Sequence, residues 1–168
     1  MADVFIDCEW VSGEYLTILG AYSFGQRKLQ LYDKTLTAGR FTRFLARCCA
    51  RAPGVFLFAH GPDIGRIERY FGLDLKKQYC CVNTQTAFRK FTNFRNVSLD
   101  HLEKHFGLPR RHILSATDID VLWTSGNRTD RRQVLEYNHE DCMNLWRLIR
   151  ILKREHGITK AELKSIAM

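Results

Sequence analysis

The sequence lacks internal repeats, low-complexity segments and long apolar runs. Only three of its 168 residues are proline, and no stretch has the composition of a linker. We therefore expect one domain, residues 1–168, which is long enough to bury a core. No apolar run approaches the roughly 20 residues that cross a bilayer, and no basic segment followed by an apolar stretch opens the chain. These absences predict a soluble, cytoplasmic protein with no membrane partner.

Paired metal-ligand spacing is also missing. The six cysteines include no Cys-x-x-Cys, and His139 with Cys142 supplies only half of a zinc site. We expect reduced cysteines, as in cytosolic proteins, and no structural zinc.

Acidic residues are fewer than basic ones. The chain has 18 Asp and Glu against 26 Lys and Arg, so its formal net charge is +8 and its sequence pI is near 9.4. A positive surface attracts polyanions, which makes nucleic acid the first partner to consider. The alternative is a merely solvated surface, because many basic proteins bind no nucleic acid.

Alternating and apolar segments predict five strands. Three strand-like segments open the chain, and turns at Ser12-Gly13 and Gly25-Gln26 fit two hairpins between them. A continuous apolar run follows later and indicates a buried parallel strand, with one more short strand after it. The predicted strands are Asp3 to Trp10, Tyr15 to Phe24, Lys28 to Tyr32, Val55 to Ala59 and Gln78 to Val82.

Apolar residues at helical spacing predict helices between and after these strands. Asn83 to Phe94 is aromatic and basic without a clean period, so no helix is assigned there. The element order predicts an α/β fold, with a mixed sheet of three antiparallel strands followed by parallel strands, flanked by helices. The predicted helices are Gly39 to Arg51, Asp63 to Phe71, one capped by Ser98 and ending at Gly107, Arg131 to about His156, and Thr159 to Ala167, where Thr159 and Glu162 form a capping box.

Acidic side chains recur where this fold would bring them together. Asp7 and Glu9 are two residues apart on an apolar strand, so both leave the same side of the sheet. Their repulsion is costly without a compensating cation, and Mg²⁺ and Mn²⁺ prefer such oxygen ligands. Asp63 follows the buried strand, and Asp141 shares a helix face with Tyr137 four residues earlier. The pattern indicates four carboxylates beside a phenol.

Each of these residues also has a simpler interpretation. Asp7 and Glu9 could lie on the solvated face of an edge strand, and Asp63 could cap the next helix. Asp141 could be a surface residue, and Tyr137 could be a core aromatic residue with its hydroxyl at the rim. The joint spacing favours a common site over these separate explanations.

Three short motifs resemble those of a known enzyme family. Phe5-Ile6-Asp7-Cys8-Glu9, Ala59-His60-Gly61-Pro62-Asp63 and Tyr137-Asn138-His139-Glu140-Asp141 look like the exonuclease motifs of the DEDD superfamily, in its tyrosine-containing DEDDy branch. The histidine branch is disfavoured because Glu136 stands where its base would be. Over about residues 3 to 152 the chain resembles YprB-like and DnaQ-like members of the ribonuclease H-like superfamily.

The resemblance implies a ribonuclease H-like fold and 3'-to-5' removal of nucleotides from single-stranded DNA or RNA. It implies two divalent metal ions, Mg²⁺ or Mn²⁺, as cofactors. Tyr137 would help to orient the attacking water, because an unperturbed tyrosine pKa near 10 makes it a poor base. The metal ligands would be Asp7, Glu9, Asp63 and Asp141.

The sequence departs from the family pattern at two places. Gly61 and Pro62 stand where Asn and Phe usually precede the second-motif aspartate, so Asp63 is the least typical ligand. Trp10 replaces the small hydroxyl residue that often follows Asp-x-Glu.

Basic and aromatic residues are candidates for holding the substrate. Phe88-Arg89-Lys90-Phe91 and Phe94-Arg95 interleave rings with charges, which suits base stacking and phosphate neutralisation. The alternatives are a loop held to the core by its phenylalanines and charges that are only solvated. Further basic clusters are Arg110-Arg111 and Arg128 with Arg131-Arg132. The predicted substrate-binding residues are Trp10, His60, Arg89, Lys90 and Arg131.

Three functions therefore stay open. The first is a metal-dependent 3'-to-5' exonuclease. The second is a nucleic-acid-binding or scaffold domain with little catalytic activity, and the third is a ribonuclease H-like endonuclease. Tyr137 before Asp141 favours the exonuclease.

Overall fold

The computed structural model describes residues 3–12, 15–25, 27–49 and 55–168, and a mixed β-sheet lies at the centre of this part of the chain. The spatial order of the strands is β3-β2-β1-β4-β5. β1, β2 and β3 pair antiparallel, whereas β4 and β5 run parallel to β1, which confirms the predicted fold class. The strands are β1 (Val4–Val11), β2 (Tyr15–Ser23), β3 (Arg27–Tyr32), β4 (Phe56–Ala59) and β5 (Cys80–Asn83).

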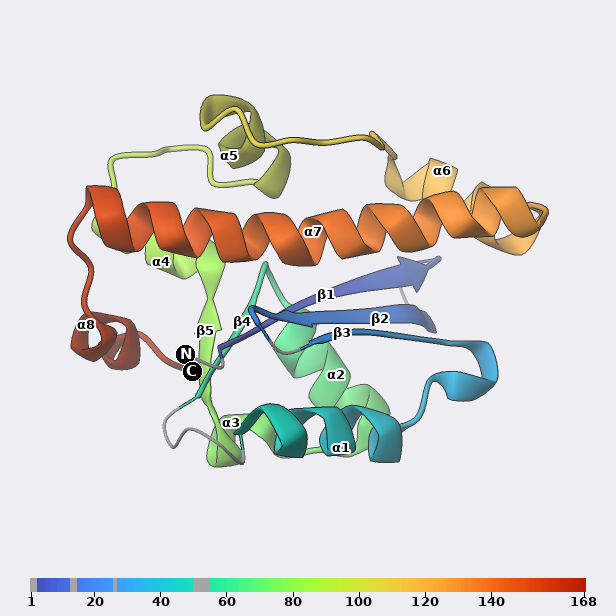
Figure 1. Ribbon diagram of the computed structural model, residues 1–168, viewed down its shortest axis with the longest axis horizontal. Helices are drawn as coiled ribbons and strands as arrows, with labels where there is room; N and C mark the ends of the chain where they lie inside the picture. The colour runs from blue at the N-terminus through green and yellow to red at the C-terminus, as the bar shows by residue number, and fades with distance from the viewer. Residues whose placement is uncertain (1–2, 13–14, 26, 50–54) are drawn as a thin grey trace.

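Helices cover both faces of the sheet. The long helix α7 crosses one face, and α1, α2 and α3 lie on the other (Figure 1). A short 3-10 helix, Asp33–Thr35, follows β3. The helices are α1 (Ala38–Cys49), α2 (Asp63–Phe71), α3 (Leu75–Gln78), α4 (Thr84–Phe91), α5 (Leu99–His105), α6 (Ala116–Thr124), α7 (Arg128–Glu155) and α8 (Lys160–Ser165).

The alternation of β1 divides its side chains between two cores. Val4, Ile6 and Cys8 pack with α1 and α2, whereas Phe5 packs with apolar residues of α7. Since Asp7 and Glu9 share the face of Phe5, they point toward α7. The pairing of β1 with β2 shifts register between Glu9 and Trp10, and Trp10 still packs on the side of Val4 and Ile6.

Gly20 lets α7 approach this face closely. It pairs with Asp7 across β1 and β2. A Cβ atom on Gly20 would overlap Asn138 Oδ1 and lie 3.0 Å from Cys142 Sγ. The missing side chain therefore makes room for two residues of α7.

Local signals predicted several element ends correctly. Ser98 caps α5 as predicted, whereas α7 begins at Arg128, three residues before its predicted start, with Asn127 as its cap. The predicted capping box of Thr159 and Glu162 is confirmed in α8. Arg51, the predicted end of the first helix, lies outside the described residues.

Three helices, α3, α4 and α6, were missed, and Gln78, the predicted first residue of the last strand, ends α3. α4 occupies most of Asn83 to Phe94, and Asn83 caps it by accepting from the Gln85 amide at 2.9 Å. Its apolar period is obscured because basic residues stand among its phenylalanines. α6 begins with a capping box of Ser115 and Asp118, which gives Asp118 a structural role.

No helix within the described residues is both long and apolar enough to pass through a bilayer.

Candidate metal centre

Three buried carboxylates meet between the sheet and the long helix. β1 supplies Asp7 and Glu9, and α7 supplies Asp141. Each offers an oxygen atom, and these atoms lie within 4.8 Å of one another. All three residues are less than a tenth exposed. The structure thus brings together three of the four predicted metal ligands.

Asn138 holds the two β1 carboxylates in place. Its Nδ2 donates to Asp7 Oδ2 at 2.9 Å, to the Asp7 carbonyl at 3.2 Å and to Glu9 Oε1 at 3.4 Å. Sequence reasoning assigned Asn138 no role. Its position three residues before Asp141, on the same helix face, is the signal that could have revealed it.

Burial and mutual repulsion raise the pKa of every carboxyl group in this cluster. Burial, followed by the charge of Asp141, raises the pKa of Glu9 to about 8. Burial and the charge of Glu9 raise the pKa of Asp7 well above its ordinary value, and burial and the charge of Asp7 do the same for Asp141. The cluster therefore favours the binding of cations, of protons as well as metal ions.

Asp63 lies beside the cluster and not within its 4.8 Å group. It is buried, and its carboxylate accepts from Trp10 Nε1 at 3.4 Å. Burial raises its pKa to about 7, while the Trp10 hydrogen bond and the Arg66 charge oppose this rise. Its charge in turn raises the pKa of Asp7. Asp63 is therefore close enough to influence the site electrostatically.

The turn at the N-terminus of α2 fixes the position of Asp63. Gly61 has a φ of +66°, a conformation that glycine adopts readily. Pro62 occupies the N-cap, and Asp63 is the first helical residue, so the interpretation of Asp63 as the cap is wrong.

Tyr137 stands at the rim of the cluster on the same face of α7 as Asp141. Burial, followed by the charges of Asp141 and Glu9, raises the pKa of its hydroxyl above the ordinary value. The phenol therefore stays protonated near neutral pH in the metal-free protein and can donate a hydrogen bond. A protonated phenol is a poor general base.

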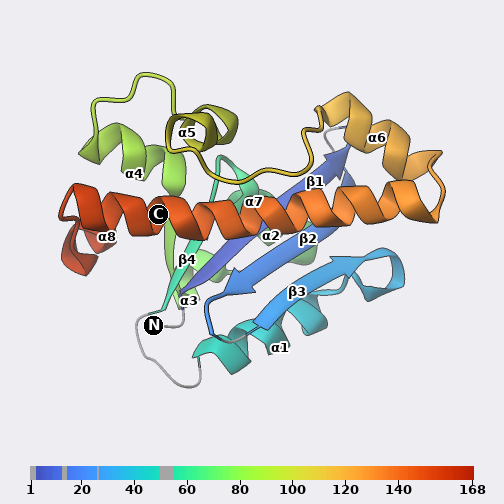
Figure 2. The same ribbon diagram turned by 45° about the horizontal axis from the view of Figure 1, so that its top comes forward.

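Arg110 reaches the cluster from the segment between α5 and α6. This segment runs alongside α7 (Figure 2). Its Nη1 donates to Asp141 Oδ1 and lies 3.4 Å from Glu103 Oε1. Its guanidinium also lies 4.4 Å from the centre of the Tyr137 ring. The sequence marked Arg110 only as half of a basic pair, because its 31-residue separation from Asp141 carries no local signal.

Comparison with known proteins identifies the family. A model of the RNase_H superfamily matches residues 4–153. The chain belongs to the RNase_H superfamily. A search of curated proteins gives no match.

A solved structure extends the likeness to three dimensions. The family B DNA polymerase from the hyperthermophilic archaeon Pyrobaculum calidifontis matches with a TM-score of 0.69 at 12% sequence identity. The match covers 97% of this chain and 26% of the polymerase chain. This similarity supports the shared fold, and the chain spans about a quarter of that polymerase.

The donor set of this RNase_H-superfamily chain fits a divalent metal ion. Nucleases of the superfamily typically use such ions, and hard cations prefer carboxylate oxygens. Asp7, Glu9 and Asp141 provide these oxygens from a buried site whose negative charges repel one another. A divalent cation would relieve that repulsion.

The same repulsion predicts a pH-dependent stability. Because the folded pKa values of Glu9 and Asp63 are about 8 and about 7, the folded protein binds protons more tightly than the unfolded chain, whose carboxyl pKa values are near 4. This stabilisation is complete at acidic pH and is lost as pH rises through the folded values. We expect the Tm of chelator-treated protein to fall by several degrees from about pH 5 to about pH 8.

Differential scanning calorimetry at constant ionic strength measures this trend. Glu9→Gln removes one titrating group and should make the slope shallower. Saturating Mn²⁺ should restore most of the lost Tm at pH 8, where the carboxylates are least protonated. The prediction would be contradicted if the Tm rose from about pH 5 to about pH 8 both in the chelator-treated protein and in Glu9→Gln.

Trp10 and His60 flank the centre. The Trp10 ring packs edge-on against Tyr70 at 6.4 Å, and the Arg66 guanidinium lies 5.3 Å from its centre. The Nδ1 atom of His60 is hydrogen-bonded to Thr84 Oγ1 at 2.7 Å, and burial lowers the pKa of His60 to about 4. His60 thus links the end of β4 to the start of α4 as a neutral ring.

The other three predicted substrate-binding residues lie on helices. Arg89 and Lys90 are exposed on α4. Phe88 is fully buried, which contradicts its use as an exposed stacking platform. Arg131 packs 5.3 Å from the Trp123 ring and 3.9 Å from Asp33. The contacts of Arg131 are therefore with α6 and the short 3-10 helix that follows β3.

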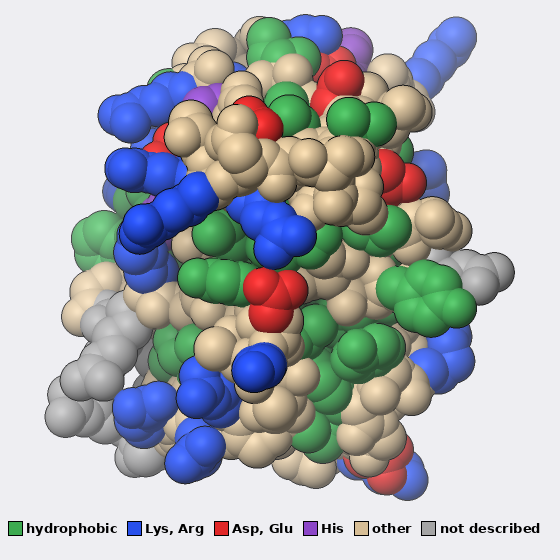
Figure 3. Space-filling view, turned by 90° about the vertical axis from the view of Figure 1, so that its right-hand side faces the viewer, with side chains coloured by type: hydrophobic (Ala, Val, Ile, Leu, Met, Phe, Trp, Pro, Cys, Tyr) green, Lys and Arg blue, Asp and Glu red, His purple; other side chains and the backbone are tan. Residues whose placement is uncertain are grey.

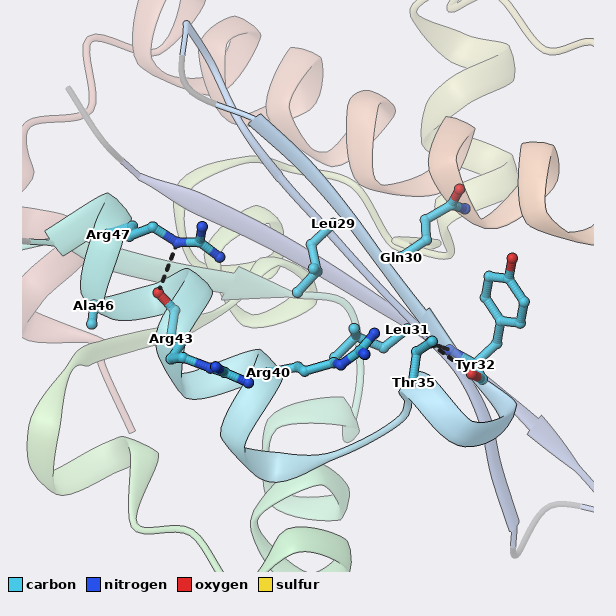
Figure 4. Close-up of a pocket in the computed structure, with 9 residues that line it drawn as sticks. All are labelled: Leu29, Gln30, Leu31, Tyr32, Thr35, Arg40, Arg43, Ala46 and Arg47. Carbon is cyan, nitrogen blue, oxygen red and sulfur yellow. Dashed lines mark hydrogen bonds between the residues drawn. The ribbon is translucent and has the colours of Figure 1, made fainter.

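Basic side chains also gather away from the carboxylates. On the end of the molecule that carries α6 and the start of α7, Lys and Arg side chains collect mainly on one side (Figure 3). A pocket of about 770 Å³ between β3 and α1 is lined by Arg40, Arg43 and Arg47 (Figure 4). Arg43 Nε donates to the Gly39 carbonyl at 3.0 Å. These surfaces suit polyanions in general.

Proposed function

We propose that this chain is a metal-dependent 3'-to-5' exonuclease of the DEDDy type that hydrolyses phosphodiester bonds of single-stranded DNA or RNA. The observation that carries the proposal is the meeting of Asp7, Glu9 and Asp141 within 4.8 Å, with Tyr137 on the same face of α7 as Asp141. Membership of the RNase_H superfamily supports a nuclease. The motif resemblance supports the direction of cleavage.

In this proposal, Asp7, Glu9 and Asp141 hold two divalent metal ions, Mg²⁺ or Mn²⁺, and Asp63 completes the ligand set. When bound, such ions polarise the phosphate and lower the pKa of a coordinated water. Asn138 keeps Asp7 and Glu9 oriented through its amide group.

Tyr137 would position the attacking water or the phosphate. Its hydroxyl stays protonated, so it can donate a hydrogen bond to an oxygen atom. Trp10 would form a wall beside the terminal nucleotide, since its ring lies next to Asp63. The excess of basic residues would attract the anionic strand to the protein.

Digestion of single strands that are labelled at the 5' end tests the proposal. With Mn²⁺ we expect a ladder of labelled products that shorten from the 3' end, and no products with excess chelator. The same strand with a blocked 3' end should resist digestion.

Circular single strands distinguish the other functions. An exonuclease leaves circles intact because they have no ends, whereas an endonuclease linearises them. A mobility shift without any cleavage would support a binding domain. Either of these results would overturn the exonuclease proposal.

A further inference from the structure

Arg110 is the one cation among the described side chains that contacts both Asp141 and Tyr137. Its side chain is 15% exposed, so the guanidinium is largely withdrawn from water. It takes up the same Asp141 carboxylate that a metal ion would need. Sequence reasoning placed Arg110 among general basic clusters, and the exonuclease proposal assigns it no role.

A frame of buried and partly buried polar contacts surrounds Arg110. Asn144 Nδ2 donates to Glu103 Oε1 at 2.8 Å and to the Pro109 carbonyl at 3.2 Å. Arg147 Nη1 donates to Asn144 Oδ1 at 2.5 Å. Asn144 lies on α7 about one turn beyond Asp141. It therefore connects that helix to Pro109, which precedes Arg110, and to Glu103, the second carboxylate partner of Arg110.

Glu103 gives the guanidinium an alternative partner. It is 4% exposed, and its carboxylate lies 3.4 Å from Arg110 Nη1. A guanidinium has several N–H donors in a planar fork, so it can give up one carboxylate while it keeps another. The contact with the Tyr137 ring can persist during that exchange.

We propose that Arg110 is a positioning residue that competes with a divalent cation for Asp141 and is retained by Glu103 when the cation binds. The inference rests on the proposed function, because it requires a divalent cation at Asp141. In the metal-free protein Arg110 satisfies the buried carboxylate. Binding of the cation releases guanidinium donors beside the site, where they can face a substrate phosphate.

Calorimetric titration with Mn²⁺ tests the competition. Arg110→Gln should bind Mn²⁺ more tightly than the wild type, by on the order of tenfold, because the competing cation is gone. Arg111→Gln is the matched control, since Arg111 is exposed and contacts Glu140 through its backbone amide. It removes one positive charge nearby, and its Mn²⁺ affinity should stay within about twofold of the wild type.

Glu103→Gln tests the alternative partner with Arg110 still present. It should bind Mn²⁺ more weakly, because Arg110 then depends on Asp141 alone. This variant also carries the test if Arg110→Gln fails to fold, which circular dichroism reveals. With a folded Arg110→Gln we expect a larger rise in Tm on Mn²⁺ addition than in the wild type.

The outcomes separate the two proposals. Mn²⁺ binding by the wild type with unchanged or weaker binding by Arg110→Gln overturns the competition and leaves the exonuclease proposal intact. Equal tightening in Arg111→Gln also overturns it, because charge alone would then be the cause. Unchanged or tighter binding by Glu103→Gln overturns the retention of Arg110 by Glu103. Absence of Mn²⁺ binding in the wild type and every variant overturns both proposals.

Discussion

Asp7→Asn and Asp141→Asn should each reduce Mn²⁺-dependent hydrolysis by about a thousandfold or more, the equivalent of several kcal/mol of lost transition-state stabilisation. Each substitution removes a negative oxygen donor from the three-carboxylate cluster. The amide that replaces Asp7 can still accept from Asn138, so the fold should be kept. Initial rates on labelled single strands measure the effect.

The Tm of these variants should also show that they lose activity without losing the fold. Asp7→Asn removes one of several repelling charges from the metal-free protein, so its Tm should stay the same or rise. Asp141→Asn also removes the carboxylate partner of Arg110, so its fold is checked by circular dichroism. Asp100→Asn is the matched control, because Asp100 lies on the surface of α5 in an exposed pair with Lys104 and should leave the rate unchanged. Full hydrolysis by both Asp7→Asn and Asp141→Asn would refute the metal-centre assignment.

Gly20→Ala should be the most damaging substitution outside the carboxylates. The added methyl group would overlap Asn138 Oδ1 and crowd Cys142 Sγ, so α7 must move away from β1 and β2. Overpacking of this kind costs about 1 to 3 kcal/mol. Chemical unfolding measures that loss, and the hydrolysis rate should fall as well because Asn138 orients Asp7.

Two further variants isolate the cause. Gly39→Ala introduces the same methyl group in α1, where nothing lies within 4 Å, and should be neutral or slightly stabilising. Adding Asn138→Ser to Gly20→Ala shortens the clashing side chain and should recover part of the stability. The rate should stay low, because serine cannot reproduce the amide contacts with Asp7 and Glu9. A Gly20→Ala protein as stable as the wild type would contradict the close packing of α7.

The fold was largely predictable because its signals are local. The two-residue period of β1 places Asp7 and Glu9 on one face, and the helical period of α7 places Tyr137 and Asp141 on another. The structure turns these faces toward each other. It brings three predicted ligands together, while their roles in metal binding stay a prediction.

The rest depended on contacts between distant segments. Gly20 is important because strand pairing places it opposite Asp7 and beneath α7, and no motif around it indicates this. Arg110 joins Asp141 through the path of the segment between α5 and α6. α4 was missed for a local reason, since its basic residues interrupt a short apolar pattern.

The continuity of helix α7 also limits where the chain can accept insertions and deletions. Tyr137, Asn138, Asp141 and Asn144 share one continuous helix, in which each added residue turns all that follows by about 100°. An insertion or deletion between residues 137 and 144 would therefore swing part of the site away from the sheet. The same change in the connection between α6 and α7 would leave these groups aligned. Related chains should vary in length at that connection and keep a constant spacing from the tyrosine to the second asparagine.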